Sequence, residues 1–203
     1  MRALPNIARE PGSRYCLDGR QEALLLTVGL MSYSPNFQGV DWFVQNIWPT
    51  FYAEHPDFTY YVVGRGAPQN LANSWSRVPG VKVLGFVDDI DSLYEKSIAV
   101  VSPVLSGAGT CIKVIEAGLR GRKVFATSVA ARGIQDADSV NWLSVFSTAA
   151  EFVCVLNQWL GMSSARRAEL QRGYASYVSS QFSFSSFCAS VGNALKEIGG
   201  RCA

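Results

Sequence analysis

The chain has 203 residues, of which 48% are hydrophobic and 17% are charged, and its formal net charge at pH 7 is +2. A chain of this length and composition buries a substantial core, which excludes a largely disordered protein. The basic residues are scattered, and their densest group, Arg120, Arg122 and Lys123, falls at the end of an expected helix, where cations favour the helix dipole. We therefore expect no nucleic-acid partner.

No apolar run approaches the ~18 to 20 residues that span a bilayer, and the first six residues lack the apolar core of a signal peptide. We expect a cytoplasmic protein without a transmembrane segment, which leaves peripheral contact with a membrane open. The five cysteines are widely spaced, odd in number and without a CxxC pair, so they indicate reduced thiols and no zinc site. We expect no structural metal and no cofactor.

Residues 1–21 are polar and contain prolines and glycines, as a tether does. Residues 23–28 form an apolar run that ends in Gly29, which predicts a buried parallel strand. An aromatic-rich helix is expected over about residues 38–54, and His55 with Pro56 ends it.

Further strands and helices alternate along the chain. Strands are expected over residues 58–63, 81–84, 98–101, 123–127 and 141–145. Asp88 and Asp89 are interpreted as an N-cap pair that opens a short helix ending near Lys96. Three helices follow the last strand, over residues 149–160, 164–178 and 184–198. Their aromatic and apolar residues at helical spacing predict a core-facing stripe, made of Tyr174, Tyr177, Phe182, Phe184, Phe187 and Val191.

This alternation predicts an α/β fold: a single Rossmann-like domain with a doubly wound parallel sheet over residues 22–147. The C-terminal helices of residues 148–203 are expected to pack on the same domain. Ligands of such sheets bind at the carboxyl ends of the strands. The turns that stand out at this edge begin at Gly29, Gly64, Gly85 and Ser106.

Residues 106–110 join an expected strand to an expected helix through two glycines. The first N–H groups of a helix point outward with the positive end of the helix dipole, and glycines let a phosphate approach them. Thr110 either caps the helix or bonds a phosphate oxygen. Glu116 lies about two turns further along, at a distance from which a carboxylate accepts both hydroxyls of a ribose. The motif alone leaves a second interpretation open, a plain tight turn followed by a solvated glutamate.

In the order and spacing of its segments the chain resembles the C-terminal, donor-binding domain of GT-B glycosyltransferases of the group 1 or family 4 type, in a GAGT-containing subgroup. The resemblance covers roughly residues 4–198, and residues 1–21 look like the linker between the two GT-B domains. The matching segments are residues 4–6, 28–29, 35–36, 63–66, 85–89, 107–113, 116–117 and 121–128.

The resemblance implies binding of a nucleotide-activated sugar, such as a UDP- or GDP-sugar, and metal-independent retaining hexosyl transfer. Glu116 matches the family's ribose-binding glutamate, and Gly29 matches the glycine beside the phosphates. Phe86 and Val87 fall where the base is held. Lys113 is either a neutraliser of phosphate charge or a solvated helix residue. The backbone that cradles the diphosphate and sugar is matched by Ser106, Gly107, Ala108, Gly109 and Thr110.

The chain departs from the family in three respects. Many members carry a second glutamate near the transferred sugar, where this chain has Ala108, a change that the GAGT subgroup shares. Many also supply Arg and Lys from the first loop, whereas residues 30–36 contain neither, so phosphate charge would rest on the helix terminus, Lys113, Arg65 or Arg132. The chain also begins at the expected linker and lacks the N-terminal domain that holds the acceptor. No catalytic residue is assigned.

We therefore expect the donor half of a polysaccharide-synthesising glycosyltransferase, completed by an acceptor-domain protein or present as a homodimer. The alternative is an inactive GT-B-like domain that serves as a protein-interaction or nucleotide-binding module. A Rossmann dehydrogenase is a weaker rival, because it requires a glycine fingerprint after the first strand, and residues 29–34 do not supply one.

Overall fold

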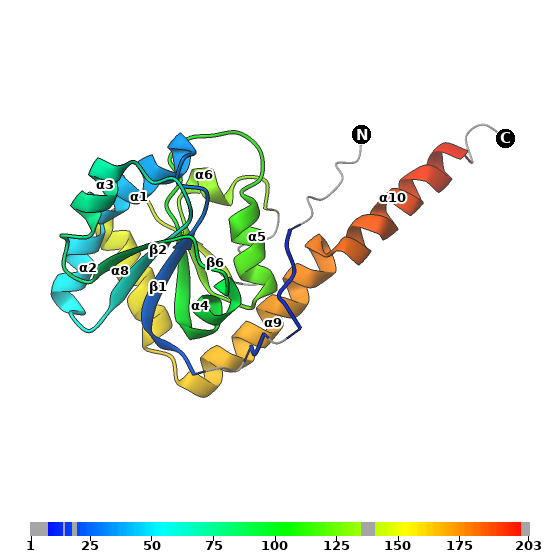
Figure 1. Ribbon diagram of the computed structural model, residues 1–203. Coiled ribbons are helices and arrows are strands. Elements are labelled where there is room, and N and C mark those ends of the chain that lie inside the picture. Colours follow the sequence, from blue (N-terminus) through cyan, green and yellow to red (C-terminus); the bar gives the residue numbers. More distant parts are fainter. Residues whose placement is uncertain (1–7, 14, 18–19, 135–140, 200–203) are drawn as a thin grey trace.

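The computed structural model describes residues 8–13, 15–17, 20–134 and 141–199, apart from some side chains of the last helix. Six parallel strands form one sheet in the order β3-β2-β1-β4-β5-β6 (Figure 1), which confirms the predicted doubly wound α/β fold. All six residues of β4 are buried, as expected of a central strand covered on both faces. The strands are β1 (Glu22–Val28), β2 (Thr59–Val63), β3 (Val81–Gly85), β4 (Ser97–Ser102), β5 (Val124–Ala126) and β6 (Leu143–Val145).

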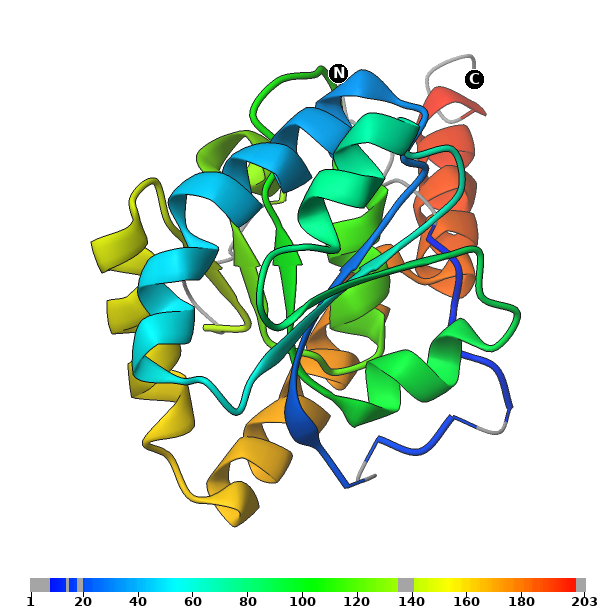
Figure 2. The same cartoon turned by 60° about the vertical axis from the view of Figure 1, so that its left-hand side comes forward.

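Helices cover both faces of the sheet (Figures 1 and 2). One face carries α1 (Ser34–Asn46), α2 (Trp48–Glu54) and α8 (Ala149–Leu160), and the other carries α4 (Ile90–Lys96), α5 (Ile112–Leu119) and α9 (Ser164–Phe182). α2 packs against α8, and α5 packs against α9. The short helices are α3 (Gln69–Trp75) and α6 (Ser128–Ala131), and α10 (Phe184–Gly199) extends away from the body.

The expected helix over residues 38–54 is wrong in two respects. It begins earlier, at Ser34, where Pro35 occupies the first turn and needs no intrahelical N–H partner. It is also broken at Ile47 (φ −113°, ψ −53°), because Pro49 has no N–H to continue the ladder. Two helices, α3 and α6, were not predicted at all.

An aromatic cluster fills the space between the sheet and the face formed by α1, α2 and α8. Phe152 of α8 meets Phe43, Phe51 and Phe146 edge-on, with ring centroids 5.0–5.8 Å apart. His55 ends α2 as predicted, and its Nε2 hydrogen-bonds Oδ1 of Asn157 at 2.8 Å. The single histidine therefore ties α2 to α8, away from the carboxyl edge of the sheet.

The predicted core-facing stripe of the C-terminal helices is only partly correct. Tyr174 and Val178 of α9 are buried against the body. Phe184 is 61% exposed, because α10 leaves the body after α9 and offers its first turn to solvent. Within the described residues, no helix combines the length and apolarity that crossing a membrane requires.

Two helical glycines provide a test of the packing between α5 and α9. A Cβ at Gly118 would lie 2.6 Å from Cζ3 of Trp142 and 2.8 Å from Cγ2 of Val178, both of them buried. A Cβ at Gly173 would meet nothing within 4 Å. We expect Gly118→Ala to lower the free energy of unfolding by about 1–3 kcal/mol through overpacking. Gly173→Ala should raise it by about 0.5–1 kcal/mol through helix propensity.

Urea unfolding of both variants measures the difference. Equal stabilisation by the two substitutions would contradict the close approach of α5 to Trp142.

Candidate functional site

The site lies where the strand order reverses. β1 and β4 are neighbours at the centre of the sheet, yet the loop after β1 leads to α1 on one face and the loop after β4 leads to α5 on the other. The two loops therefore diverge and leave a crevice at the carboxyl edge, the place where open parallel sheets bind their ligands. Two adjoining cavities occupy this region.

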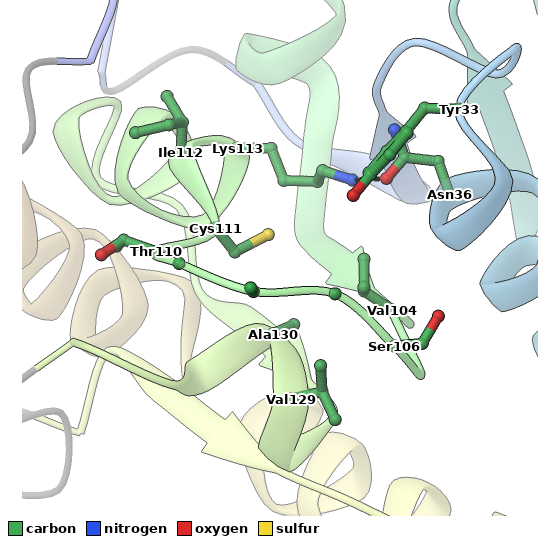
Figure 3. A pocket seen from close by; sticks show the side chains of 13 residues that line it. Tyr33, Asn36, Val104, Ser106, Thr110, Cys111, Ile112, Lys113, Val129 and Ala130 are labelled. Atoms are coloured by element: carbon green, nitrogen blue, oxygen red, sulfur yellow. Dashed lines mark hydrogen bonds between the residues drawn. The ribbon is translucent and has the colours of Figure 1, made fainter.

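The first cavity lies beside the glycine-rich turn (Figure 3) and has a volume of about 210 Å³. Gly107 (φ 131°) and Gly109 (φ 81°) both have backbone conformations that residues with a Cβ rarely adopt, so the turn requires glycine at these positions. Residues 106–109 are exposed, which leaves their backbone accessible from the cavity. The lining residues are Tyr33, Asn36, Val104, residues 106–113, Val129 and Ala130.

The expected cap of the motif helix is wrong. The N-cap of α5 is Cys111, and no side-chain hydrogen bond caps the helix. Thr110 instead lies close to Gly133: a Cβ added to Gly133 would be 3.0 Å from Oγ1 of Thr110. The other expected role of Thr110, a bond to a phosphate oxygen, stays a prediction.

Lys113 lines the first cavity beside Gly29 of the second, and it reaches across the crevice to the first turn of α1. Its ammonium donates to Oδ1 of Asn36, whose amide in turn donates to the Leu30 carbonyl at 2.8 Å. Burial lowers the pKa of Lys113. The described part of the chain offers its ammonium no ion pair with a carboxylate. The charge of Glu116 favours the protonated lysine, but no contact ion pair in this part of the chain neutralises it, so this partly buried cation at the mouth of a crevice is suited to an anionic ligand.

The second cavity, with a volume of about 320 Å³, extends from Gly29 toward β3. Its rim carries Phe86, which is 56% exposed, and the guanidinium of Arg65 stacks on the Phe86 ring at 3.8 Å from the ring centre. The lining is otherwise mainly apolar, and its residues are Arg9, residues 28–30, Val63, Gly64, Arg65, Phe86, Val87, Ile90, Tyr94, Glu116 and Arg120.

Glu116 is the carboxylate of the second cavity. Burial raises its pKa, although the charge of Arg120 and the backbone N–H of Arg9 favour the ionised form. The neighbouring Tyr94 hydroxyl is buried, and the described residues provide it with no hydrogen-bond partner. Glu116 thus belongs to a partly buried polar end of an otherwise apolar cavity.

Each of the ten residues predicted to bind donor lines one of the two cavities. The first holds Ser106, Gly107, Ala108, Gly109, Thr110 and Lys113, and the second holds Gly29, Phe86, Val87 and Glu116. Of the two alternative phosphate cations, Arg132 donates to the Gly107 carbonyl at 3.4 Å, whereas Arg65 lies at the second cavity against Phe86. Of the predicted N-cap pair Asp88 and Asp89, Asp89 is the N-cap of α4 and accepts the Ser92 N–H at 3.1 Å.

The cavities are also lined by residues for which no sequence pattern predicts a role there: Arg9, Tyr33, Asn36 and Arg120. Arg120 was interpreted as a cation at a helix end, yet only 1% of it is exposed. Their contacts join segments up to 111 residues apart, as between Arg120 and Arg9, so no local pattern signals them.

The thiol of Cys111 faces the first cavity (Figure 3). Its Sγ lies 3.5 Å from Oγ of Ser102, and the four described cysteines are free. His55 is bonded to Asn157 elsewhere, so Cys111 has no histidine base. No group of three or more His, Cys, Asp or Glu residues within the described ranges is arranged to hold a metal.

Comparison with known proteins identifies the fold and the family. The family model described as Glycosyl transferases group 1 matches residues 22–160. Among solved structures, WaaG, described as a glycosyltransferase involved in lipopolysaccharide biosynthesis, aligns with a TM-score of 0.66 and 20% identity over 92% of this chain. The chain spans 54% of the length of WaaG.

Two further solved structures align with this chain. The C-terminal domain of the group 1 family protein LpcC from Francisella tularensis aligns with a TM-score of 0.63 and 17% identity, over 86% of this chain and 96% of that one. Alr3699/HepE from Anabaena, in complex with UDP and glucose, aligns with a TM-score of 0.62 and 16% identity, over 87% of this chain and 48% of HepE. At these identities the structures establish the fold alone, and the fold corresponds to a single C-terminal domain.

The raised pKa of Glu116 predicts a pH-dependent cost to stability. Because the pKa is higher in the folded chain than in the unfolded one, folding loses stability as pH rises through the interval between the two values. Glu116→Gln removes this cost, and we expect it to raise Tm at pH 7 by about 2 °C, a small shift because the carboxyl keeps some contact with water.

The advantage of Glu116→Gln should vanish at about pH 3, below the ordinary glutamate pKa of ~4.3, where the Glu116 carboxyl is protonated in both the folded and the unfolded chain. Thermal scans at the two pH values measure it, with Glu54→Gln at the exposed end of α2 as the control. A Tm advantage that is the same at both pH values would refute the raised pKa.

Proposed function

The chain belongs to the group 1 glycosyltransferases, and we propose from this membership that it is the donor-binding half of a glycosyl-transfer site. The ligand is a nucleotide-activated sugar of the UDP or GDP type, held across both cavities. The sugar and the outer phosphate lie in the first cavity, and the nucleoside lies in the second. The observation that carries the proposal is the partly buried ammonium of Lys113, which lines the first cavity beside Gly29 of the second and makes no ion pair with a carboxylate among the described residues.

The diphosphate fits this position for electrostatic reasons. Lys113 supplies a positive charge that has already lost much of its hydration, so it gives up little further solvation when an anion arrives. The exposed backbone of residues 106–109 lies beside it, at the start of α5, and both glycines of this turn leave room for phosphate oxygens. A Cβ at Gly29 would come within 3.2 Å of the ammonium, so glycine keeps this approach open as well.

The nucleoside fits the second cavity. Glu116 offers carboxylate oxygens to the ribose hydroxyls, and the apolar lining with the Phe86 ring suits a flat base. Arg65, stacked on Phe86, adds donors next to this ring. The complex of HepE with UDP and glucose supports a ligand of this class, since HepE shares the fold.

Transfer needs an acceptor held against the donor sugar in a site from which water is excluded. The first cavity carries the exposed side chain of Tyr33 and the exposed turn residues on its rim, so we propose that a second binding unit closes over it. That unit belongs either to the same polypeptide or to another chain. Because Ala108 supplies no carboxylate near the sugar, we assign no catalytic residue here, and no metal enters the proposal.

Nucleotide binding by the chain tests the proposal. Calorimetric titration should show saturable binding of UDP or GDP that Glu116→Ala weakens at least about tenfold, the effect of one to two hydrogen bonds to a charged group. Glu54→Ala, at an exposed position remote from both cavities, is the matched control. If neither nucleotide binds, the proposal fails, and the interpretation of the chain as an inactive interaction module takes its place.

Lys113 should contribute to binding of the diphosphate and not to binding of the nucleoside. We expect Lys113→Met to weaken UDP or GDP binding about 10- to 100-fold, because it removes a charge-assisted contact worth about 1.5–3 kcal/mol. Binding of the corresponding nucleoside, uridine or guanosine, should stay unchanged. The same titrations with Lys96→Met, an exposed lysine of α4, control for the loss of a positive charge. Equal weakening of nucleotide and nucleoside would argue against a diphosphate at Lys113.

A further inference from the structure

The segment that precedes β1 forms one wall of the second cavity. We call residues 8–12 the N-terminal strap; Ala8 is buried, and Arg9 lines the cavity beside Glu116. The backbone N–H of Arg9 lies near enough to the Glu116 carboxylate to favour its ionised form, and both residues line the same cavity. A segment outside the sheet and its helices thus lies beside the proposed ribose-binding group.

Arg120 holds the first part of the strap in place. Its guanidinium donates to the carbonyls of Arg9 (3.0 Å) and Glu10 (3.4 Å), and also to the Glu116 carbonyl (3.1 Å). The same guanidinium pairs with Oδ1 of Asp91 at 2.7 Å and lies 4.7 Å from the centre of the Tyr94 ring. Because Arg120 is buried and several partners fix it, the backbone at Arg9 has a defined position relative to α5.

Asp91 holds the other end of the strap. Its Oδ2 accepts the Gly12 N–H at 2.8 Å, while its Oδ1 is engaged with Arg120. A Cβ at Gly12 would lie 3.0 Å from this Oδ2, so the approach is close. The strap is therefore clamped at residues 9–10 and at residue 12, and both clamps involve the carboxylate of Asp91 on α4.

We propose that the N-terminal strap is a positioning element of the donor site, in which the Arg9 N–H orients the Glu116 carboxylate to receive the ribose hydroxyls. This inference rests on the proposed function. The terminal torsion of a glutamate is broad, so an unrestrained carboxylate samples many orientations. An ionised carboxylate has about four lone-pair sites, and one N–H bond leaves the others available to a diol. If the orientation of the carboxylate is fixed before the ligand binds, less conformational entropy of the Glu116 side chain is lost on binding.

A purely structural role of the strap would change stability but not the recognition of ribose. The discriminating quantity is the ratio of dissociation constants for a 2′-deoxynucleotide and its ribonucleotide, measured with dUDP and UDP and with dGDP and GDP. In the unmodified chain we expect a ratio of about 10 or more, the effect of one hydrogen bond to a charged group.

Arg9→Pro removes the N–H beside the Glu116 carboxylate, and we expect it to lower this ratio at least about fivefold, toward 1. Arg9→Ala keeps the backbone N–H, so the ratio should stay the same even if the affinities for the ribonucleotide and the deoxynucleotide both change. Ser13→Pro is the matched proline control, since Ser13 is exposed in a turn closed by the Tyr15 N–H and the Gly12 carbonyl (3.0 Å), where proline is accepted. Ser13→Pro should keep the ratio as well.

Asp91→Asn provides an independent variant in case Arg9→Pro does not fold. Asparagine has a single acceptor oxygen and cannot serve both Gly12 and Arg120, so the ratio should fall here too. If folded Arg9→Pro keeps the ratio of the unmodified chain, the inference about the strap is overturned. If Arg9→Pro does not fold, an unchanged ratio in Asp91→Asn overturns it instead. In either case the proposed donor site still stands, because the unmodified chain discriminates ribose. Absence of any nucleotide binding by the unmodified chain overturns the proposed function and this inference together.

Discussion

The reversal of strand order between β1 and β4 is the constraint on which the site depends. Because α1 and α5 leave the sheet on opposite faces, the chain cannot close the crevice between the loops that precede them. On the other side of β1, the loops after β1 and β2 pack closely at Gly64 (φ 144°), where a Cβ would lie 1.6 Å from the Gly29 carbonyl oxygen. Backbone thus lies against backbone in the wall of the second cavity, which both glycines line.

Buried basic residues connect this crevice to the rest of the molecule. Arg120 and Arg122 have exposures of 1% and 0%, and their guanidinium groups donate to backbone carbonyls of the segment before β1. Arginine suits this task because its planar fork stays charged and serves several carbonyls at once. Lys123, 3% exposed, donates in the same way to the Asn141 carbonyl at 2.6 Å. The basic group that the sequence places at a helix end therefore links separate segments of the chain through buried hydrogen bonds, and Lys113 is the basic residue that lines the first cavity.

The sequence predicts the sheet well and the site in part, for physical reasons that differ between elements. The apolar composition of residues 23–28 predicts a buried strand, and the glycines at 107 and 109 predict a turn with positive φ. Both features depend on neighbouring residues alone, so the sequence predicts them. The break at Ile47 follows from Pro49, a local signal that the aromatic pattern of the helix outweighed. The contact of Lys113 with Asn36 spans 77 residues, and the clamp of Arg120 on Arg9 spans 111. Such contacts depend on the assembled fold, and no periodicity or spacing reveals them.

The charges that line the crevice are costly to the stability of the empty domain. Lys113 and Glu116 lie three residues apart on α5, and burial opposes the ionised form of each. A helix of this amphipathic pattern would be more stable with apolar residues at both positions, since buried charges seldom repay their lost hydration by mutual attraction. In the proposed complex a nucleoside diphosphate would reverse the balance, because its phosphates would neutralise the lysine while its ribose hydroxyls hydrogen-bond the carboxylate. The same two residues that weaken the empty domain would then make it most stable with its donor bound, so ligand occupancy and folding are linked through α5.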